Sequence, residues 1–144
     1  MQWQIATAEN IETLAHLNRQ LNEDEGAEPL PLPEAIDRLT RWLASDYTAI
    51  LFKIDGTTVA YTLFRPTDPD SEGYPGGVFV RQFLVARDRR RQGIGKRAFQ
   101  ILRKEIWPSN CTVLLDTQYD NSRAQEFWRS VGFSEYHLSF KLQD

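Results

Sequence analysis

The sequence predicts a mixed α/β (α+β) fold, in which helices cover both faces of a twisted, mostly antiparallel sheet. Apolar runs with strand and helix periodicity follow one another in the order β-α-α-β-β-β-α-β-α-β. A hairpin dipeptide, Asp55-Gly56, joins two of the strand-like runs. One helix, which begins at a glycine turn near residue 93, supplies the only crossover expected between parallel strands. We expect residues 1–144 to form a single domain with a sizeable core.

In the first half of the chain, periodicity predicts one strand, two helices and the hairpin. A strand is expected at residues 3–6, and a helix at about 10–21, where apolar residues recur at helical spacing. Prolines after this helix prevent it from continuing, and a second helix is expected from about 33 to 44. The strands of the hairpin are expected at residues 47–54 and 57–64.

The second half opens with a proline-, glycine- and acid-rich segment, residues 65–77, which predicts an exposed loop. Three more strands and two more helices should alternate after it. They are expected at 78–86 (strand), from the glycine turn to about 105 (helix), 112–117 (strand), 122–131 (helix) and 136–142 (strand). Only eleven residues follow Phe133, so the last strand should be single and leave a sheet edge that the second subunit of a homodimer can cover.

The bulk composition is that of a soluble globular protein, with 41% apolar and 26% charged residues. No apolar run approaches the roughly 20 residues needed to cross a bilayer, and the first residues lack the layout of a signal peptide. The lone Cys111 cannot form an internal disulfide. We therefore expect a cytoplasmic protein with no membrane partner.

Charge is distributed unevenly along the chain. Residues 1–72 hold 5 basic and 13 acidic residues, whereas residues 73–144 hold 12 basic and 7 acidic ones. The formal net charge is therefore −8 for the first half and +5 for the second. A basic half indicates an anionic ligand, and an acidic half indicates a cationic one.

A glycine motif follows the strand expected at 78–86. Arg90, Gly93 and Gly95 stand in an R-x-x-G-x-G pattern at the start of an amphipathic helix. Such a helix start carries unsatisfied N–H groups and a partial positive charge, and glycines allow an anion to approach them closely. The pattern is neither a dinucleotide fingerprint nor a P-loop. Taken alone, it fits equally a helix that simply begins after a loop.

A second motif lies near the end of the chain. Asn121, Ala124, Trp128, Gly132 and Phe133 have the spacing N-x-x-A-x-x-x-aromatic-x-x-x-G-F. Together with the glycine motif and its flanks, it resembles the GNAT superfamily of N-acetyltransferases. The resemblance implies the GNAT fold, acetyl-CoA as cosubstrate without a metal, and acyl transfer to a primary amine by direct attack in a ternary complex.

The resemblance also implies which residues bind acetyl-CoA. The backbone of the strand before the glycine turn holds the pantetheine arm, the turn cradles the pyrophosphate, and the asparagine lies near the CoA arm. These residues are Phe83, Leu84, Val85, Arg90, Arg91, Gln92, Gly93, Ile94, Gly95, Lys96 and Asn121. The arginine run lacks any accompanying nucleic-acid recognition pattern, so no nucleic-acid partner is expected.

Attack of an amine on a thioester requires a base, an oxyanion donor and a proton for the leaving thiolate. By resemblance, the backbone N–H groups of Leu84 and Val85 are the expected oxyanion donors. Asp116 matches a base position used by some members of the family, although it equally fits a strand end or a substrate-positioning residue. Another common base position holds Gln82, which cannot accept a proton at neutral pH.

The general acid has no clear candidate. Trp128 stands where many family members carry a tyrosine, and an indole is not a practical acid. Either another residue serves or the thiolate takes its proton from solvent. The candidates are Tyr74, Tyr119, Tyr136 and His137.

The acceptor is expected beside the first two helices. The acidic residues there, among which we favour Glu25, can bind a cationic amine or can simply be solvated. Because Gln82 and Trp128 depart from the family pattern, an acyl-CoA-binding or sensing module with little turnover is the alternative function.

Overall fold

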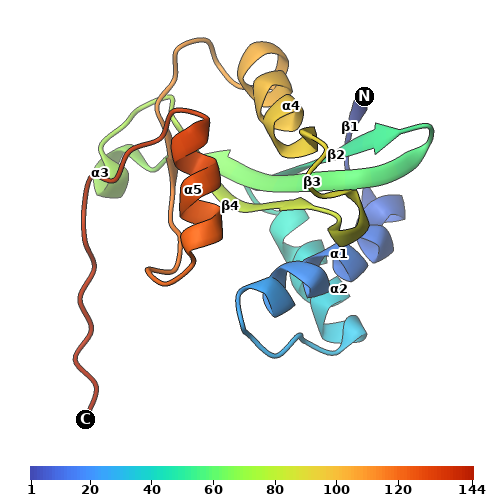
Figure 1. The fold of residues 1–144 in the computed structure, drawn as a ribbon, viewed down its shortest axis with the longest axis horizontal. Coiled ribbons are helices and arrows are strands. Elements are labelled where there is room, and N and C mark those ends of the chain that lie inside the picture. The colour runs from blue at the N-terminus through green and yellow to red at the C-terminus, as the bar shows by residue number, and fades with distance from the viewer.

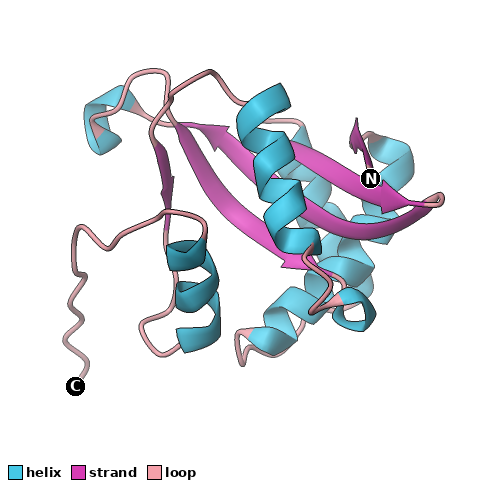
Figure 2. Ribbon diagram, turned by 45° about the horizontal axis from the view of Figure 1, so that its top comes forward, coloured by secondary structure: helices cyan, strands magenta, loops and turns pink.

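A computed structural model describes residues 1–144 and confirms the mixed sheet with helices on both faces (Figure 1, Figure 2). Five strands lie in the order of the chain, and the first four pair antiparallel while the last two are parallel. The strands are β1 (Gln2–Ile5), β2 (Thr48–Ile54), β3 (Thr57–Pro66), β4 (Val78–Val85) and β5 (Val113–Leu115).

Two pairs of helices cover the sheet. The helices α1 (Ile11–Asp24) and α2 (Leu32–Leu43) pack on one face, and α4 (Ile94–Ile101) and α5 (Ser122–Ser130) pack on the other. The chain adds a short helix, α3 (Pro69–Glu72), single turns at Ala8–Asn10 and Arg87–Arg89, and a π-helical turn at Leu102–Ile106 that continues α4. No helix is both long and apolar enough to cross a membrane.

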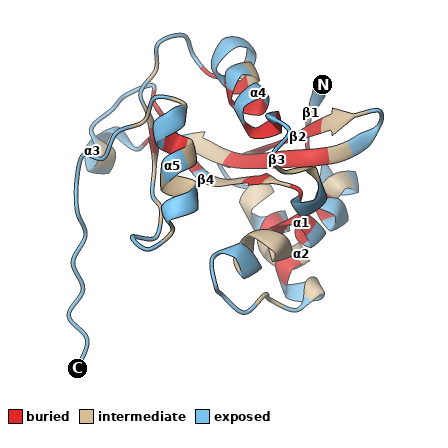
Figure 3. Cartoon of the chain, viewed as in Figure 1, coloured by how far each residue is buried: buried red, intermediate tan, exposed pale blue.

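Each face of the sheet has its own apolar core, and the strands separate the two (Figure 3). Side chains alternate between faces, so Leu51 joins the core under α1 and α2, while Ile50 and Phe52 join the core under α4 and α5. All three are fully buried. Burying one such side chain contributes about 1.5–3 kcal/mol.

The hairpin predicted at Asp55-Gly56 is confirmed. Both residues have positive φ, 51° and 77° respectively, as a type I′ turn requires. The turn aligns β2 and β3 from Thr48↔Phe64 to Ile54↔Thr57. This ribbon forms the middle of the sheet.

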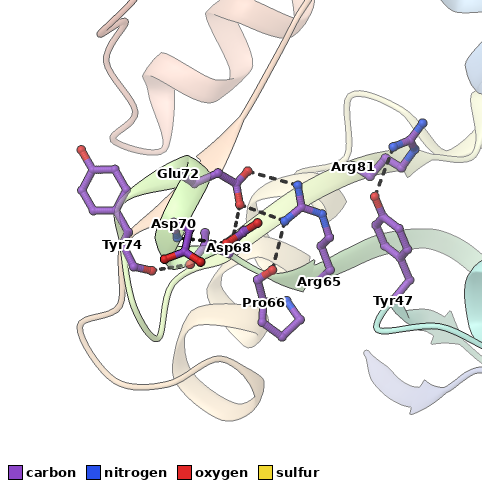
Figure 4. A network of polar contacts seen from close by, with 9 residues as sticks. Tyr47, Arg65, Pro66, Asp68, Asp70, Glu72, Tyr74 and Arg81 are labelled. Atoms are coloured by element: carbon purple, nitrogen blue, oxygen red, sulfur yellow. Dashed lines mark hydrogen bonds and ion pairs between the residues drawn. The ribbon is translucent and has the colours of Figure 1, made fainter.

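The segment at 65–77 is more ordered than a simple exposed loop. Arg65 makes two hydrogen bonds to the carboxylate of Glu72, at 2.9 and 3.1 Å, and thereby ties α3 to the end of β3 (Figure 4). Asp68 caps α3 by accepting a hydrogen bond from the Asp70 N–H at 2.9 Å.

The strand predicted at 136–142 is wrong. Residues 134–144 contain no strand or helix and lead away from the sheet (Figure 1). Leu138, Phe140 and Leu142 are 79%, 89% and 93% exposed. Alternating apolar and polar residues are compatible with a strand, but a strand also needs a partner strand with free backbone groups. The neighbouring edge of the sheet is β5, which is only three residues long.

Candidate active site

The two parallel strands separate and leave a cleft between them. β4 and β5 pair only from Val78↔Val113 to Val80↔Leu115, and β4 then continues to Val85 with no strand on that side. A cleft of about 650 Å³ lies there, bounded by the end of β4, the start of α4, the chain after β5, and α5. This volume is in the usual range of small-molecule sites.

A β-bulge lies where β4 leaves β5. Leu63 pairs with Gln82, but the next residue of β3, Phe64, pairs with Val80, so Arg81 is the extra residue. A bulge increases the local twist, which turns the end of β4 away from its neighbour.

The register of β4 decides which backbone groups face the cleft. The Ala86 N–H donates to the Val59 carbonyl, and by the alternation of an antiparallel ladder the pair that contains Leu84 is also hydrogen-bonded. Val85 lies between these pairs, so its backbone groups turn toward the cleft. Consistently, Arg90 Nε donates to the Val85 carbonyl at 3.1 Å. Of the two predicted oxyanion donors, Val85 is therefore the one with a free N–H on the cleft side.

The two glycines of the first motif have different structural roles. Gly93 precedes α4 with a φ of 74°, a left-handed conformation that glycine adopts without strain. Gly95 is buried, and a Cβ built on it would lie 3.0 Å from Cε1 of Phe127. Glycine at 95 therefore permits the close approach of α4 to α5, while glycine at 93 shapes the turn that opens the helix.

Cations without ion-pair partners gather at this cleft. Their side chains come from the basic turn, the first turn of α4 and the first turn of α5. They are Arg89, Arg91, Lys96 and Arg123, and the unpaired Arg81 of β4 lines the cleft as well. Positive side chains beside the N–H groups of a helix start suit a bound phosphate.

Two other arginines of the same turn are already paired with the end of α1. Arg87 contacts Glu23 at 2.9 Å, and Arg90 contacts Asp24 at 2.5 Å. The side chain of Arg90 is only 16% exposed. The structure therefore places Arg90 as a link between the basic turn, β4 and α1, and its predicted contact with phosphate stays a prediction.

The start of α5 closes the cleft. The Asn121 side chain caps this helix by accepting a hydrogen bond from the Ala124 N–H at 3.2 Å, and it also lines the cleft. Trp128 is buried against Phe83, with ring centroids 5.2 Å apart, and Phe83 stacks on Phe127 at 5.6 Å. The tryptophan at the family's tyrosine position is thus part of an aromatic core.

A second pocket, of about 330 Å³, adjoins the cleft on the side of α1 and α2. The two hollows share five lining residues at the bulge and at the ends of β5 and α1. These are Glu25, Val80, Arg81, Gln82 and Asp116. Asp116 follows β5 directly and is exposed, so the predicted base lies at the junction of the two hollows.

A buried polar chain fixes the side chain of Gln82 at this junction. Asn18 Nδ2 donates to the Tyr61 hydroxyl at 3.3 Å, and that hydroxyl donates to Gln82 Oε1 at 2.9 Å. Burial raises the pKa of Tyr61 above its ordinary value, which keeps the hydroxyl protonated as a donor. The Gln82 amide N–H₂ group therefore stays available to a ligand.

Of the remaining predicted residues, the acceptor-binding candidate Glu25 lines the hollows, whereas the candidates for the general acid do not. Glu25 lines both hollows, and partial burial, followed by the charge of Asp24, raises the pKa of its carboxyl, while Arg38 lowers it. No tyrosine or histidine lines either hollow, so none of the four acid candidates does.

Sequence reasoning missed Arg38, Trp42 and Arg81, which line the second pocket. One signal was present, because Arg38 and Trp42 are four residues apart and so share a helix face. The orientation of Arg81 depends on the bulge, for which the sequence carries no mark.

Comparison with known proteins bears on the family and the fold of the chain. A family model described as the acetyltransferase (GNAT) family matches residues 11–133. No curated protein sequence matches the chain.

Several solved structures share the fold at low sequence identity. A possible acetyltransferase from Clostridium difficile 630 is 16% identical with a TM-score of 0.77, covering 99% of this chain and 96% of its own. An aminoglycoside N-acetyltransferase in complex with CoA is 16% identical with a TM-score of 0.76, covering 99% and 93%. A ribosomal-protein-alanine N-acetyltransferase from Brucella melitensis biovar Abortus 2308 is 14% identical with a TM-score of 0.73, covering 99% of each chain.

Proposed function

Since this chain belongs to the acetyltransferase (GNAT) family and is thus an acetyl-CoA-dependent N-acetyltransferase, we propose that it acetylates a primary amine by direct attack in a ternary complex. One observation supports the proposal most directly: two neighbouring hollows beside β4 share Gln82 and Asp116 in their lining. Donor and acceptor can therefore be bound together, with their reactive ends at one junction.

The larger cleft fits acetyl-CoA, which supplies an activated acyl group as a thioester. The start of α4 and the unpaired cations Arg91 and Lys96 would hold its pyrophosphate. The backbone of Val85 would hold the pantetheine arm, and its N–H would stabilise the oxyanion. The cleft thus offers charge at one end and backbone donors at the other.

Asp116 would accept the proton that the acceptor ammonium must lose before it attacks. Its carboxylate lies at the junction and is exposed, so it can reach an amine directly or through water. With no tyrosine or histidine in either hollow, we assign protonation of the thiolate to solvent.

The absence of a tyrosine or histidine from the lining of both hollows also favours the alternative function, an acyl-CoA-binding module with little turnover. The two functions differ in one measurable product, free CoA released in the presence of an amine. We would titrate the protein with acetyl-CoA and its 3′-dephospho analogue by calorimetry, then measure free thiol with a panel of amines. Binding with amine-dependent thiol release supports the enzyme, binding without release supports the module, and no binding at millimolar acetyl-CoA contradicts both.

We also propose a homodimer in which the tail of one copy covers the open edge of the other. Tyr136, Leu138, Phe140 and Leu142 lie at alternating, exposed positions, and β5 has a free edge. Light scattering should give a dimer that Leu138→Ser with Phe140→Ser converts to a monomer. A monomeric parent protein, or a dimer that survives both changes, would contradict this.

A further inference from the structure

Two arginines flank one tryptophan in the second pocket. The guanidinium carbons of Arg38 and Arg81 each lie 4.7 Å from the ring centroid of Trp42. Arg81 Nη1 also donates to the hydroxyl of Tyr47 at 3.1 Å, which holds the guanidinium in place (Figure 4). Both arginines line the pocket, so two oriented cations face one small volume.

Neither guanidinium forms an ion pair with a carboxylate. Arg38 donates from Nη2 to Asn18 Oδ1 at 3.0 Å, but its Nε is buried without an acceptor. Partial burial, and next the charge of Arg81, lower the pKa of Arg38 below its ordinary value. Two guanidiniums without an ion pair, one of which keeps a buried unsatisfied donor, make this end of the pocket a favourable place for an anion.

The other end of the same pocket is negative. Glu25 and Asp116 line it, and Asp116 lies at the junction with the larger cleft. The pocket is therefore bipolar: it has a cationic end against α2 and an acidic end where the reaction is proposed to occur. A ligand that matches both ends carries an anion and an ammonium a short distance apart.

We propose that the acceptor is a small amine that also carries a carboxylate, as a free amino acid does. This proposal rests on the proposed function. The carboxylate lies between Arg38 and Arg81, where a planar guanidinium can bind two carboxylate oxygens at once, and the ammonium lies toward Asp116. The volume of about 330 Å³ suits a molecule of this size.

The reaction then balances with the groups already named. The ammonium loses one proton to Asp116, and the nitrogen forms a bond to the acetyl carbonyl carbon. The carbon–sulfur bond breaks as the thiolate leaves with its electron pair and takes a proton from solvent. After the attack the nitrogen still carries two protons, of which one passes to solvent and one stays on the amide. The products are an N-acetyl amino acid and CoA.

This arrangement disfavours polycationic acceptors. A polyamine or an aminoglycoside would bring several positive charges against two guanidiniums that form no ion pair. Glu25, which was expected to bind a cationic amine, would then bind an acceptor with a single ammonium group, at the acidic end of the pocket.

The first test compares matched acceptors. Free amino acids are assayed beside their amides and their decarboxylated amines, for example lysine, lysinamide and cadaverine, with thiol release as the readout. The carboxylate-bearing member should have a kcat/KM at least about tenfold higher, the factor lost with one charged contact. Equal or faster acetylation of the amides and amines would overturn the proposal.

The second test changes the guanidiniums. Arg81→Gln should lower the ratio of kcat/KM for the amino acid to that for its decarboxylated amine about tenfold, while Arg81→Lys retains part of it. Arg38→Gln should act in the same direction. Arg97→Gln, an exposed arginine of α4 that lines neither hollow, is the matched control. An unchanged ratio in both variants would sink the proposal.

Calorimetry with acetyl-CoA separates the two possible failures. If acetyl-CoA does not bind, the proposed function fails and the acceptor proposal fails with it. If acetyl-CoA binds and only amines without a carboxylate are acetylated, or no amino acid is, the acceptor proposal fails alone.

Discussion

The two neighbouring hollows beside β4 differ in the kind of group they offer. The larger cleft presents backbone N–H groups at the start of α4 and at Val85, together with unpaired cations. The smaller pocket presents side chains of both signs, Arg38 and Arg81 against Glu25 and Asp116. Backbone donors and cations at a glycine turn suit a ligand shared by a whole family, whereas a particular set of side chains suits one acceptor. The contrast assigns general binding to the first hollow and specificity to the second.

The largest expected effect is at the junction of the two hollows. Asp116→Asn removes the proton acceptor and should lower turnover about 100-fold, equivalent to about 2.7 kcal/mol. The calorimetric Kd for acetyl-CoA should not change. Asp120→Asn, a nearby exposed carboxylate outside both hollows, is the control. Unchanged turnover in Asp116→Asn would remove the base assignment.

Gly95→Ala should damage the larger cleft by distorting its wall. The added methyl would lie 3.0 Å from Phe127, so the Phe127 ring and its packing between α4 and α5 must give by a few tenths of an ångström, at a cost of about 1–2 kcal/mol in the free energy of unfolding. Urea unfolding measures this cost. Combining the change with Phe127→Leu should restore part of the stability. A fully stable Gly95→Ala would show that α4 and α5 tolerate a wider separation.

Paired and unpaired arginines of the basic turn should differ in their effect on the donor. Arg91→Gln should weaken acetyl-CoA binding about fivefold, or about 1 kcal/mol, and more at low salt than at high salt. Arg87→Gln is the matched change in the same turn, and because Arg87 is paired with Glu23 it should leave the affinity unaltered. Equal losses in the two variants would contradict the assignment of the unpaired cations to phosphate.

The smallest effect is expected at α3, away from both hollows. The hydrogen bonds from Arg65 lower the pKa of Glu72, so this contact stabilises the fold above the ordinary glutamate pKa and is lost as pH falls through the lowered value. Glu72→Gln should therefore lower the free energy of unfolding by up to about 1 kcal/mol at neutral pH, with the difference vanishing in acid. Urea midpoints across pH check this, and acetyl-CoA affinity should not change.

Much of the larger cleft could be predicted because its groups are close in sequence. A strand, a glycine turn and a helix start place Val85, Gly93 and Lys96 together through local geometry alone. The smaller pocket could not be predicted from the sequence, because its residues come from separate segments. Arg38 comes from α2, Arg81 from a bulge in β4, and Asp116 from the end of β5. Only tertiary packing brings these three segments to one place.

The error at residues 136–142 has a related cause. Alternation in sequence fixes which side chains share a face of a strand, but it carries no information on the partner. The helix predicted at 122–131 needed no partner to form its hydrogen bonds, and it is present as α5. For Asn121, the sequence indicated its place in a motif, but it did not indicate that the side chain caps α5.

The most direct test of the account is a crystal structure of the complex with CoA. We predict that the pyrophosphate lies against residues 91–96 and that the thiol reaches the junction between Gln82 and Asp116, open to the pocket of Arg38 and Arg81. A pyrophosphate bound elsewhere, or a thiol separated from that pocket by protein, would contradict the claim that donor and acceptor meet beside Gln82 and Asp116.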